Sequence, residues 1–320
     1  MDYWQKEVYK ESVLKSAQAV VGGEILRKKR ILVTGASGLI GSFLTDVLIE
    51  LGAEVFVAGR KLNILETRFS KAEALQYDLN GEIVFDEELD YVIHAAGYGH
   101  PKVFAENPVG TLNSIIGGTD RLLRYSLDHR VKRFLYISSG EVYGGIDSMN
   151  PRGCYPIGKK AAECLCASYT GQYGLDTVVA RLCHTFGPGA SESDNRAATE
   201  FLQKASRCED IILKSKGEQL RSYLYAADSA SAILSVLKSG MSGEAYDIAS
   251  GENVITIAGL AELIAEAFGV NVCYEIAEGS EKNDQTPIET QVLDPKKINE
   301  LGWQSIYTLS DGVMAMKQYI

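Results

Sequence analysis

The sequence predicts an α/β protein with a Rossmann-type, doubly wound parallel sheet and a smaller C-terminal domain. Short apolar runs alternate with helical segments through the first half of the chain. These runs are apolar without polar alternation, as expected for strands that are covered on both faces. The first run ends in a glycine-rich segment, Thr34 to Gly41, which is typical of a strand-to-helix turn that binds phosphate.

The expected elements follow in order along the chain. Strands are predicted at 31–33, 54–58, 91–97, 133–138 and 177–181, and helices at 41–51, 113–129, 155–173, 224–237 and 256–268. Loop-rich stretches at 188–197 and 279–287 interrupt the second half. These patterns predict a helical extension (1–29), a dinucleotide-binding domain (30–180) to which 225–250 returns, and a mainly substrate-binding domain (181–320).

Bulk properties exclude several classes of function. The net charge of −10 over 320 residues argues against a nucleic-acid-binding surface. No apolar run approaches the roughly 20 residues of a membrane span. Residues 1–29 carry charges throughout and lack the apolar stretch of a signal peptide. We expect one amphipathic helix packed outside the core, with the apolar residues Trp4, Val8, Leu14, Ala17 and Val21. A basic membrane-binding patch at 27–30 is the alternative.

The six cysteines contain no Cys-x-x-Cys pair, and no His or Cys cluster has the spacing of metal ligands. Reduced thiols in a cytoplasmic protein without a metal are therefore expected. Cys154 stands next to Tyr155, but the tyrosine already accounts for the chemistry described below.

The glycine-rich segment is the predicted cofactor turn. Glycines at positions 35, 38 and 41 allow a tight turn, close approach of the backbone to a pyrophosphate, and close packing of helix on strand. The free amides of the following helix face the phosphates. Small residues that end the strand at 91–97 complete the expected site. The residues predicted to bind the cofactor are Gly35, Ser37, Gly38, Leu39, Ile40, Gly41, Ala95, Ala96 and Gly97.

The end of the second strand distinguishes NADP from NAD. An acidic residue there would accept hydrogen bonds from the ribose hydroxyls. The strand instead ends in Gly59, Arg60 and Lys61. Arginine binds a 2′-phosphate in bidentate fashion, so the sequence favours NADP, with Arg60 as its ligand. NAD remains the alternative, because arginine can also stack on adenine.

Tyr155 and Lys159 are the predicted centre of the chemistry. Residues four apart share a helix face, so the Lys159 ammonium can lie near the Tyr155 phenol. A cation about 4 Å away at an effective dielectric of about 20 contributes roughly 4 kcal/mol, on the order of three pKa units. We therefore expect a lowered pKa for Tyr155, which would make it a proton acceptor, with Ser139 bonded to its hydroxyl. The alternative is an ordinary surface Tyr and Lys.

In this order, the three segments resemble those of the extended short-chain dehydrogenase/reductase superfamily, in particular its NAD-dependent epimerase/dehydratase family. Ser139, Tyr155 and Lys159 match its catalytic trio. Segments 181–189 and 221–228 are similar to its strand-end motif and to its substrate-binding arginine segment. The resemblance implies a Rossmann fold, a nucleotide-sugar substrate held between the domains, and a homodimer formed by the helices at 113–129 and 155–173. The second helix also predicts this homodimer, because it carries more apolar surface than one contact with the sheet needs: Ala161, Ala162, Leu165, Cys166 and Tyr169. Tyr155 and Lys159 would also contact the cofactor.

Segments 150–155 and 194–196 look most like the UDP-glucuronate decarboxylase branch. That resemblance implies a UDP-sugar, with Arg196 and Arg221 near its phosphates. The chain departs from the pattern at Gly59, where an acidic ribose ligand is usual, and at His184, where an asparagine contacts the substrate. It also departs at Gly140, where 4,6-dehydratases carry an aspartate.

Four reactions share one first step, in which Tyr155 takes a proton from a sugar C4 hydroxyl while hydride passes to the nicotinamide. Decarboxylation of a UDP-uronic acid is favoured, because it needs no acid at Gly140 and Glu141 is kept. C4 epimerisation, net 4-ketoreduction and 4,6-dehydration are the alternatives. Glu141 either takes part in the chemistry or bonds backbone or a substrate hydroxyl. A non-enzymatic nucleotide-binding regulator is the alternative from another class.

Overall fold

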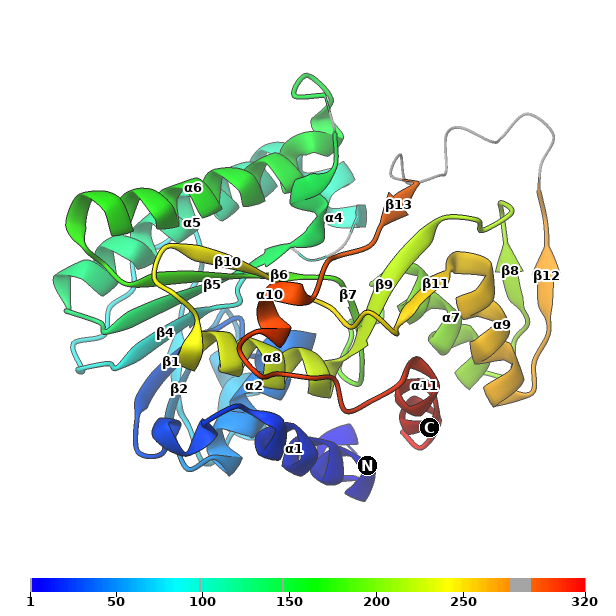
Figure 1. The fold of residues 1–320 in the computed structure, drawn as a ribbon, viewed down its shortest axis with the longest axis horizontal. Coiled ribbons are helices and arrows are strands. Elements are labelled where there is room, and N and C mark those ends of the chain that lie inside the picture. The colour runs from blue at the N-terminus through cyan, green and yellow to red at the C-terminus, as the bar shows by residue number, and fades with distance from the viewer. Residues whose placement is uncertain (1, 98, 100, 146, 277–288, 320) are drawn as a thin grey trace.

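The computed structural model describes residues 2–97, 99, 101–145, 147–276 and 289–319. Figure 1 shows a central sheet with helices above and below it, and a smaller group of strands and helices at one end. The expected loop at 279–287 lies outside the described residues.

The central sheet has seven parallel strands, which confirms the predicted doubly wound α/β fold. In order across the sheet they are β10 (Glu244–Ile248), β6 (Thr177–Leu182), β5 (Arg133–Ser139), β4 (Tyr91–His94), β1 (Arg30–Thr34), β2 (Glu54–Gly59) and β3 (Glu73–Gln76). The sequence pattern did not reveal β3, a short and partly exposed edge strand. The strand expected at 91–97 ends at His94, where a loop of small residues begins.

Two hydrophobic layers cover the two faces of this sheet, because successive residues of a strand point to opposite sides. Ile31 and Val33 pack into one layer, and Leu32 packs into the other. On the first face lie α2 (Leu39–Glu50), α3 (Leu62–Arg68) and α8 (Ala226–Ser239). On the second lie α5 (Pro108–Asp128) and α6 (Cys154–Tyr173), with α4 (Pro101–Glu106) against α5.

The N-terminal segment consists of η1 (Tyr3–Gln5), α1 (Glu7–Ala19) and η2 (Gly23–Leu26). The expectation that this helix packs outside the core is wrong. Tyr9, Val13 and Ala17 belong to the first hydrophobic layer, and α1 packs against α2 and α8. Leu14, expected on the apolar face, is 45% exposed. Buried serines explain the error, because Ser12 and Ser16 share the inward face and weaken the apolar pattern.

The second half of the chain builds the smaller region at the right of Figure 1. It contains β7 (His184–Phe186), β8 (Ile211–Leu213), β9 (Leu220–Tyr225), β11 (Val254–Thr256), β12 (Val272–Tyr274), β13 (Thr290–Gln291), α7 (Ala197–Ser206), α9 (Ile257–Phe268) and α11 (Leu309–Lys317). The short helix α10 (Lys296–Asn299) instead packs against β10 of the main sheet. The chain leaves this region between β9 and β11. There α8 covers the main sheet, and β10 pairs with β6 at its edge.

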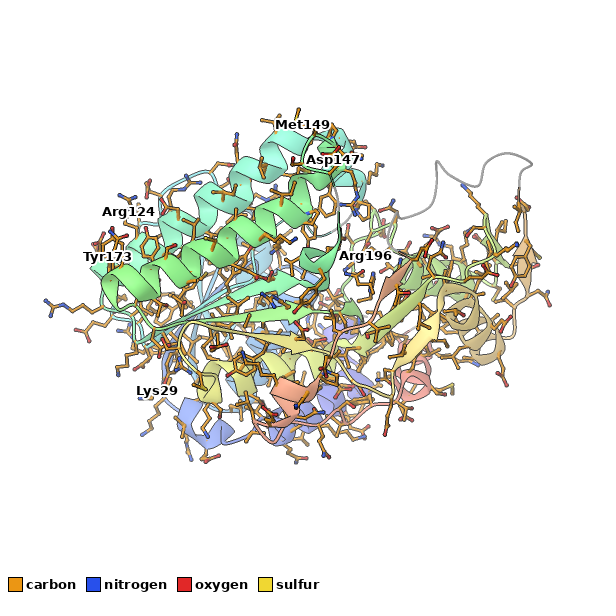
Figure 2. All side chains as sticks on the ribbon, turned by 45° about the horizontal axis from the view of Figure 1, so that its top comes forward. Lys29, Arg124, Asp147, Met149, Tyr173 and Arg196 are labelled. Carbon is orange, nitrogen blue, oxygen red and sulfur yellow. The ribbon has the colours of Figure 1, made fainter. Side chains whose placement is uncertain are left out.

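Helix α6 is more deeply buried than its sequence suggested. Ala162, Cys166 and Tyr169 were expected to offer apolar surface to a second subunit, but they pack inside the chain in the second hydrophobic layer. Ala161 and Leu165 are only partly buried. In Figure 2, Tyr173 and Arg124 mark one end of the α5/α6 pair, and Met149 and Asp147 lie beyond the other.

None of the helices in the described ranges combines the length and the apolar character that a membrane crossing requires. The same ranges contain no group of three or more His, Cys, Asp or Glu side chains arranged to hold a metal ion.

Candidate active site

The glycine-rich turn joins β1 to α2. Gly35 has φ 71°, and a Cβ on it would lie 2.7 Å from the Ala96 backbone. A Cβ on Gly41 would lie 2.3 Å from the Gly35 oxygen. Both positions therefore exclude a side chain. At Gly38 a Cβ would meet only the Gly35 oxygen, at 3.4 Å, so the space over this glycine is open.

Helix α2 starts at Leu39, and no side chain caps its first amides. Uncapped amides at a helix N-terminus attract an anion. Ser37 and Gly38 are exposed, Ile40 is partly exposed, and Leu39 is buried under the turn. A dinucleotide pyrophosphate fits this open, glycine-lined turn.

The loop after β4 forms the neighbouring wall. The Ala96 amide donates to Thr34 Oγ1 at 3.2 Å, and this oxygen lies 3.0 Å from His94 Nδ1. Ala95 and Ala96 are partly buried, and a Cβ added at Gly97 would meet nothing within 4 Å. The loop thus presents a small-residue surface beside the turn. Burial and the Lys159 charge lower the pKa of His94 to about 3, so this imidazole is neutral.

Arg60 and Lys61 follow β2 as exposed cations. Gly59, the last residue of β2, carries no carboxylate, and a Cβ there would lie 3.9 Å from Ser37 Oγ. The end of β2 is therefore adjacent to the glycine-rich turn and is positively charged.

Tyr155, Ser139 and Lys159 come together where β5 ends against the start of α6. Ser139 is the last residue of β5, and its side chain and the Tyr155 phenol line the same cavity. Lys159 Nζ donates to the Ile137 carbonyl at 2.7 Å. The same ammonium lies 4.7 Å from the centre of the Tyr136 ring and 5.8 Å from that of Tyr155.

The expected lowering of the Tyr155 pKa by Lys159 is wrong for the protein alone. Burial raises the pKa of Tyr155 to about 12, and the Glu141 charge adds to the rise. The Ser139 hydrogen bond and the charges of Arg196 and Arg152 oppose it. Burial also lowers the pKa of Lys159 to about 8. Desolvation explains the difference, because burying both groups disfavours their charged forms and helical spacing does not report burial.

Glu141 lies in η3 (Gly140–Tyr143), directly after Ser139, and its amide donates to Ser139 Oγ at 3.2 Å. Its carboxylate pairs with Arg152 of η4 (Pro151–Gly153), with 2.9 Å between Oε2 and Nη2. The Arg152 guanidinium lies 5.2 Å from the centre of the Phe104 ring. Phe104 in turn stacks on Tyr155 at 4.3 Å. These contacts hold a paired carboxylate close to the Tyr155 phenol.

A cavity of about 450 Å³ extends from this point toward the smaller region. Ser139, Glu141, Arg152 and Tyr155 line one end, and α7, β8 and β9 line the other. The charged residues among the described lining are Arg152, Arg196, Lys214, Arg221, Glu141 and Glu200. Cations outnumber carboxylates, which suits an anionic ligand.

The three predicted substrate residues all line this cavity. Arg196 Nε donates to both Asp194 oxygens at 3.0 Å, and Figure 2 places it at the gap between the main sheet and the smaller region. Arg221 is 3% exposed and donates to the Glu289 carbonyl at 3.0 Å. Burial lowers the pKa of His184 to about 3, and its Nδ1 has no hydrogen-bond partner in the described part of the chain.

Sequence reasoning gave no separate role to two residues of the site. Arg152 was noted only as part of a decarboxylase-like segment, and Phe104 was not singled out. The sequence could have indicated that Arg152 lies near the site, because it stands only three residues before Tyr155. The partnership of Phe104 with both Arg152 and Tyr155 depends on tertiary contact and leaves no local pattern.

The profile of the NAD dependent epimerase/dehydratase family matches residues 31–249. The chain is 31% identical to UDP-glucuronic acid decarboxylase 1 of Xenopus tropicalis over 306 residues, which cover 89% of this chain and 70% of the relative. It is 27% identical to the low-salt glycan biosynthesis protein Agl12 of Haloferax volcanii, over 90% of this chain and 97% of the relative.

Two solved structures have the same fold. The UDP-glucose 4-epimerase of Thermotoga maritima, determined with UDP-glucose, has a TM-score of 0.79 at 25% identity and covers 91% of this chain and 98% of its own. The enzyme WbmF of Bordetella bronchiseptica, in complex with NAD⁺, has a TM-score of 0.77 at 24% identity, with coverages of 92% and 93%.

Proposed function

Because the chain belongs to the NAD dependent epimerase/dehydratase family, we propose that it modifies a nucleotide sugar and that its reaction is the decarboxylation of a UDP-uronic acid. The relative from Xenopus tropicalis has this activity in its name. The observation that carries the proposal is the Glu141–Arg152 pair beside Tyr155. Arg152 Nη1 is buried and has no hydrogen-bond partner among the described residues, and an unpaired guanidinium donor suits a sugar carboxylate.

A nicotinamide dinucleotide held at the glycine-rich turn would supply the acceptor for the C4 hydride, and would return that hydride to C4 after carbon dioxide has left. Tyr155, beside Ser139, takes the proton of the C4 hydroxyl. The resulting 4-ketone weakens the bond between C5 and its carboxylate, because the electron pair left by departing carbon dioxide delocalises into the ketone. A proton then replaces the carboxylate at C5. Glu141 is suitably placed to orient the water or the substrate for that step.

Lys159 keeps the role expected on sequence grounds, which is to favour the ionised form of Tyr155, although burial dominates the pKa of both groups in the protein alone. Its ammonium is anchored on the Ile137 carbonyl and faces the catalytic ring at 5.8 Å. A cation fixed there stabilises the phenolate that forms when Tyr155 acts as a base. Lys159 therefore lowers the free energy of the ionised form of Tyr155 during turnover.

Two observations bear on the other reactions. A Cβ at Gly140 would lie 2.9 Å from the Leu293 side chain, so this position lacks room for an acid, and classical 4,6-dehydration is disfavoured. C4 epimerisation is the second candidate. It needs only ketone rotation and hydride return, and the likeness to the Thermotoga maritima 4-epimerase favours it. Net 4-ketoreduction would require a cofactor renewed outside the enzyme.

The cofactor of the family is a nicotinamide dinucleotide, and we propose NADP for this chain. Arg60 and Lys61 supply positive charge at the end of β2, where Gly59 offers no acceptor for ribose hydroxyls. A 2′-phosphate would gain charge-assisted hydrogen bonds from Arg60.

We also propose a homodimer through α5 and α6, which lie side by side on one face of the sheet (Figure 1). Ala161 and Leu165 are partly buried, and Cys164 and Val109 are exposed. These residues replace the deeply buried positions first expected at the interface. Light scattering at micromolar concentration tests the proposal, and a monomer would contradict it.

Incubation with a panel of UDP-sugars and either NAD or NADP, followed by mass spectrometry, tests the reaction. We expect UDP-glucuronate to lose carbon dioxide. Loss of water would indicate dehydration, and a gain of hydride would indicate ketoreduction. An unchanged mass with a new C4 configuration would indicate epimerisation. Any one of these three products in place of decarboxylation would overturn the proposed reaction.

A further inference from the structure

The N-terminal segment precedes the part of the chain that matches the family profile, which begins at residue 31. It is nevertheless firmly attached to the cofactor side of the fold. Tyr9 of α1 donates to Asp46 of α2 at 2.5 Å, and Arg68 of α3 pairs with the same carboxylate. Arg68 is 9% exposed. This network joins α1 to the two helices that follow the glycine-rich turn and the end of β2.

A cavity of about 310 Å³ lies where these elements meet. Its lining residues come from four places: Tyr3 and Trp4 from η1, Ser37 and Ser42 from the glycine-rich turn and α2, Asn63, Ile64, Thr67, Arg68 and Phe69 from α3 and its end, and Gly189 from the loop after β7. One wall of this cavity is therefore part of the predicted cofactor site, and the opposite wall is aromatic and N-terminal.

The cavity offers groups that suit a ribose and its phosphate. Ser37, Asn63 and Thr67 provide neutral donors and acceptors. Arg68 Nε is buried and has no hydrogen-bond partner in the described ranges of the chain. Arg60 and Lys61 directly precede α3 and add positive charge. Hydroxyl, amide and guanidinium donors are the usual partners of phosphorylated ribose.

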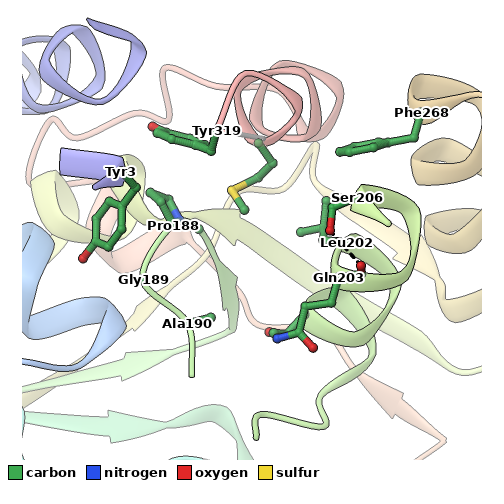
Figure 3. A pocket seen from close by; sticks show the side chains of 12 residues that line it. Tyr3, Pro188, Gly189, Ala190, Leu202, Gln203, Ser206, Phe268 and Tyr319 are labelled. Atoms are coloured by element: carbon green, nitrogen blue, oxygen red, sulfur yellow. Dashed lines mark hydrogen bonds between the residues drawn. The ribbon is translucent and has the colours of Figure 1, made fainter. Parts of the chain in front are cut away.

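The aromatic wall is held in place on both sides. The Arg68 guanidinium lies 4.6 Å from the centre of the Trp4 ring, a cation–π distance. Tyr3 stands against Gly189, where a Cβ would lie 2.5 Å from the Tyr3 hydroxyl oxygen. Figure 3 shows Tyr3 beside Gly189 and Pro188, at the edge of a second cavity on that side. Only glycine at position 189 leaves room for this ring.

We propose that Tyr3 and Trp4 form the outer wall of the pocket for the adenosine-ribose end of the dinucleotide, so that the N-terminal segment is part of the cofactor site. The ligand class is a phosphorylated adenosine, whose ribose would lie between Ser37 and the aromatic wall. The inference rests on the nicotinamide dinucleotide of the proposed function, but it does not depend on which sugar reaction follows.

Adenosine 2′,5′-bisphosphate is the probe, because it carries the 2′-phosphate and lacks the nicotinamide. Calorimetry should show that Trp4→Ala weakens its binding about tenfold, or roughly 1.4 kcal/mol, as apolar contact with the ribose is lost. Leu14→Ala is the matched control, since Leu14 is an exposed apolar residue of the same segment. Its Kd should stay within about twofold of that of the unmodified protein. Equal affinities for the Trp4→Ala and unmodified proteins would overturn the proposal.

Fluorescence gives a second readout that does not require the alanine variant to fold. The chain has two tryptophans, Trp4 and Trp303, and Trp303 is 1% exposed in the core. Binding of the bisphosphate should change the emission of the unmodified protein, and Trp4→Phe should abolish that change. No emission change on binding, or a change retained in Trp4→Phe, would overturn the proposal. Loss of sugar turnover with these binding results intact would instead count against the proposed function.

Discussion

The two sides of the candidate active site differ in the kind of groups that form them. The proposed cofactor side is mostly backbone and small residues, with Gly35, Gly38 and Gly41 in the turn and Ala95 and Ala96 beside it. The proposed substrate side consists of long charged side chains, several of which are held by ion pairs or by backbone carbonyls. The geometry of a site formed by backbone groups is determined by the local sequence. The geometry of a site formed by charged side chains depends on ion-pair and hydrogen-bond partners from distant parts of the sequence.

The largest effect is expected at Tyr155, which lies between the cofactor side and the substrate side. Tyr155→Phe removes the proton acceptor without altering the turn, so turnover should fall about 10² to 10⁴-fold while dinucleotide binding stays nearly unchanged. Steady-state kinetics and a binding titration on the same preparation measure both quantities. Tyr173→Phe is the control, because Tyr173 is 52% exposed at the far end of the same helix, α6. Activity within about threefold of the unmodified enzyme would contradict the assignment of Tyr155.

Glu141→Gln tests whether the substrate side uses its carboxylate chemically. We expect product formation to fall at least about 100-fold, the low end for an acid-base group, while reduced nicotinamide still accumulates on adding substrate. Absorbance of the reduced cofactor and product analysis measure the two steps.

The opposite result is expected if Glu141 has no chemical role and acts on Tyr155 only through its charge. The Glu141 charge raises the pKa of Tyr155, so removing that charge would ease ionisation of the phenol and leave turnover unchanged or higher. That outcome would favour the epimerase alternative. Glu200→Gln is the control, since Glu200 lines the same cavity at a more exposed position.

Two alanine substitutions test whether backbone alone builds the cofactor side. Gly41→Ala drives a Cβ against the Gly35 oxygen and should cost about 1 to 3 kcal/mol of stability, as overpacking does. Gly38→Ala meets only that oxygen at 3.4 Å, so stability should be kept while dinucleotide binding falls. Urea unfolding and a binding titration separate the two effects. Equal stability losses would show that the space over Gly38 is not open.

The buried Lys159 should leave a pH signature in stability. Its pKa is about 8 in the folded chain and about 10.4 when unfolded. Between these values the unfolded chain binds more protons, so the contribution of Lys159 to stability rises with pH. Below about pH 8 the cost is fully present, at most about 3 kcal/mol.

Lys159→Met removes that cost, although it leaves the Ile137 carbonyl without its donor. We expect the variant to be more stable than the unmodified protein by about 1 to 3 kcal/mol at pH 7, with the difference shrinking toward about pH 10. Urea unfolding across this range measures it. A difference that does not change with pH would show that Lys159 is not buried as a cation.

Arg60→Ala removes the charged side chain predicted to bind a 2′-phosphate, and its effect should be the smallest. An exposed cation on a 2′-phosphate contributes about 1 to 3 kcal/mol, and nearer the lower value when solvated. NADP binding should weaken much more than NAD binding in paired titrations. Equal losses for the two cofactors would show that Arg60 contacts adenine or nothing.

The sequence reveals most of what depends on local pattern. Apolar runs located five of the seven strands of the main sheet, β1, β2, β4, β5 and β6, and the glycine spacing located the turn. The sequence predicted that 225–250 returns to this domain, but it did not predict β10 as a strand. The trio of Ser139, Tyr155 and Lys159 also follows from order along the chain. The Tyr155 pKa was given the wrong sign, because its value depends on burial that spacing does not report.

The Glu141–Arg152 pair and the aromatic wall of Tyr3 and Trp4 were missed for another reason. Each joins segments whose contact is decided by the packing of whole helices. Tyr3 reaches Gly189 only because α1 docks on α2 and α8. The edge strand β3 escaped because it is short and half exposed, and so lacks a continuous apolar run.

The pairing of β10 with β6 has a consequence for how the protein is made. Strand β6 ends at Leu182, but its outer neighbour begins at Glu244, so a nascent chain must emerge well beyond β6 before that edge can be covered. Until then β6 is an unpaired edge open to other chains. A fragment ending at Leu182 would keep this edge bare and would lack α8, so we expect it to aggregate when expressed alone.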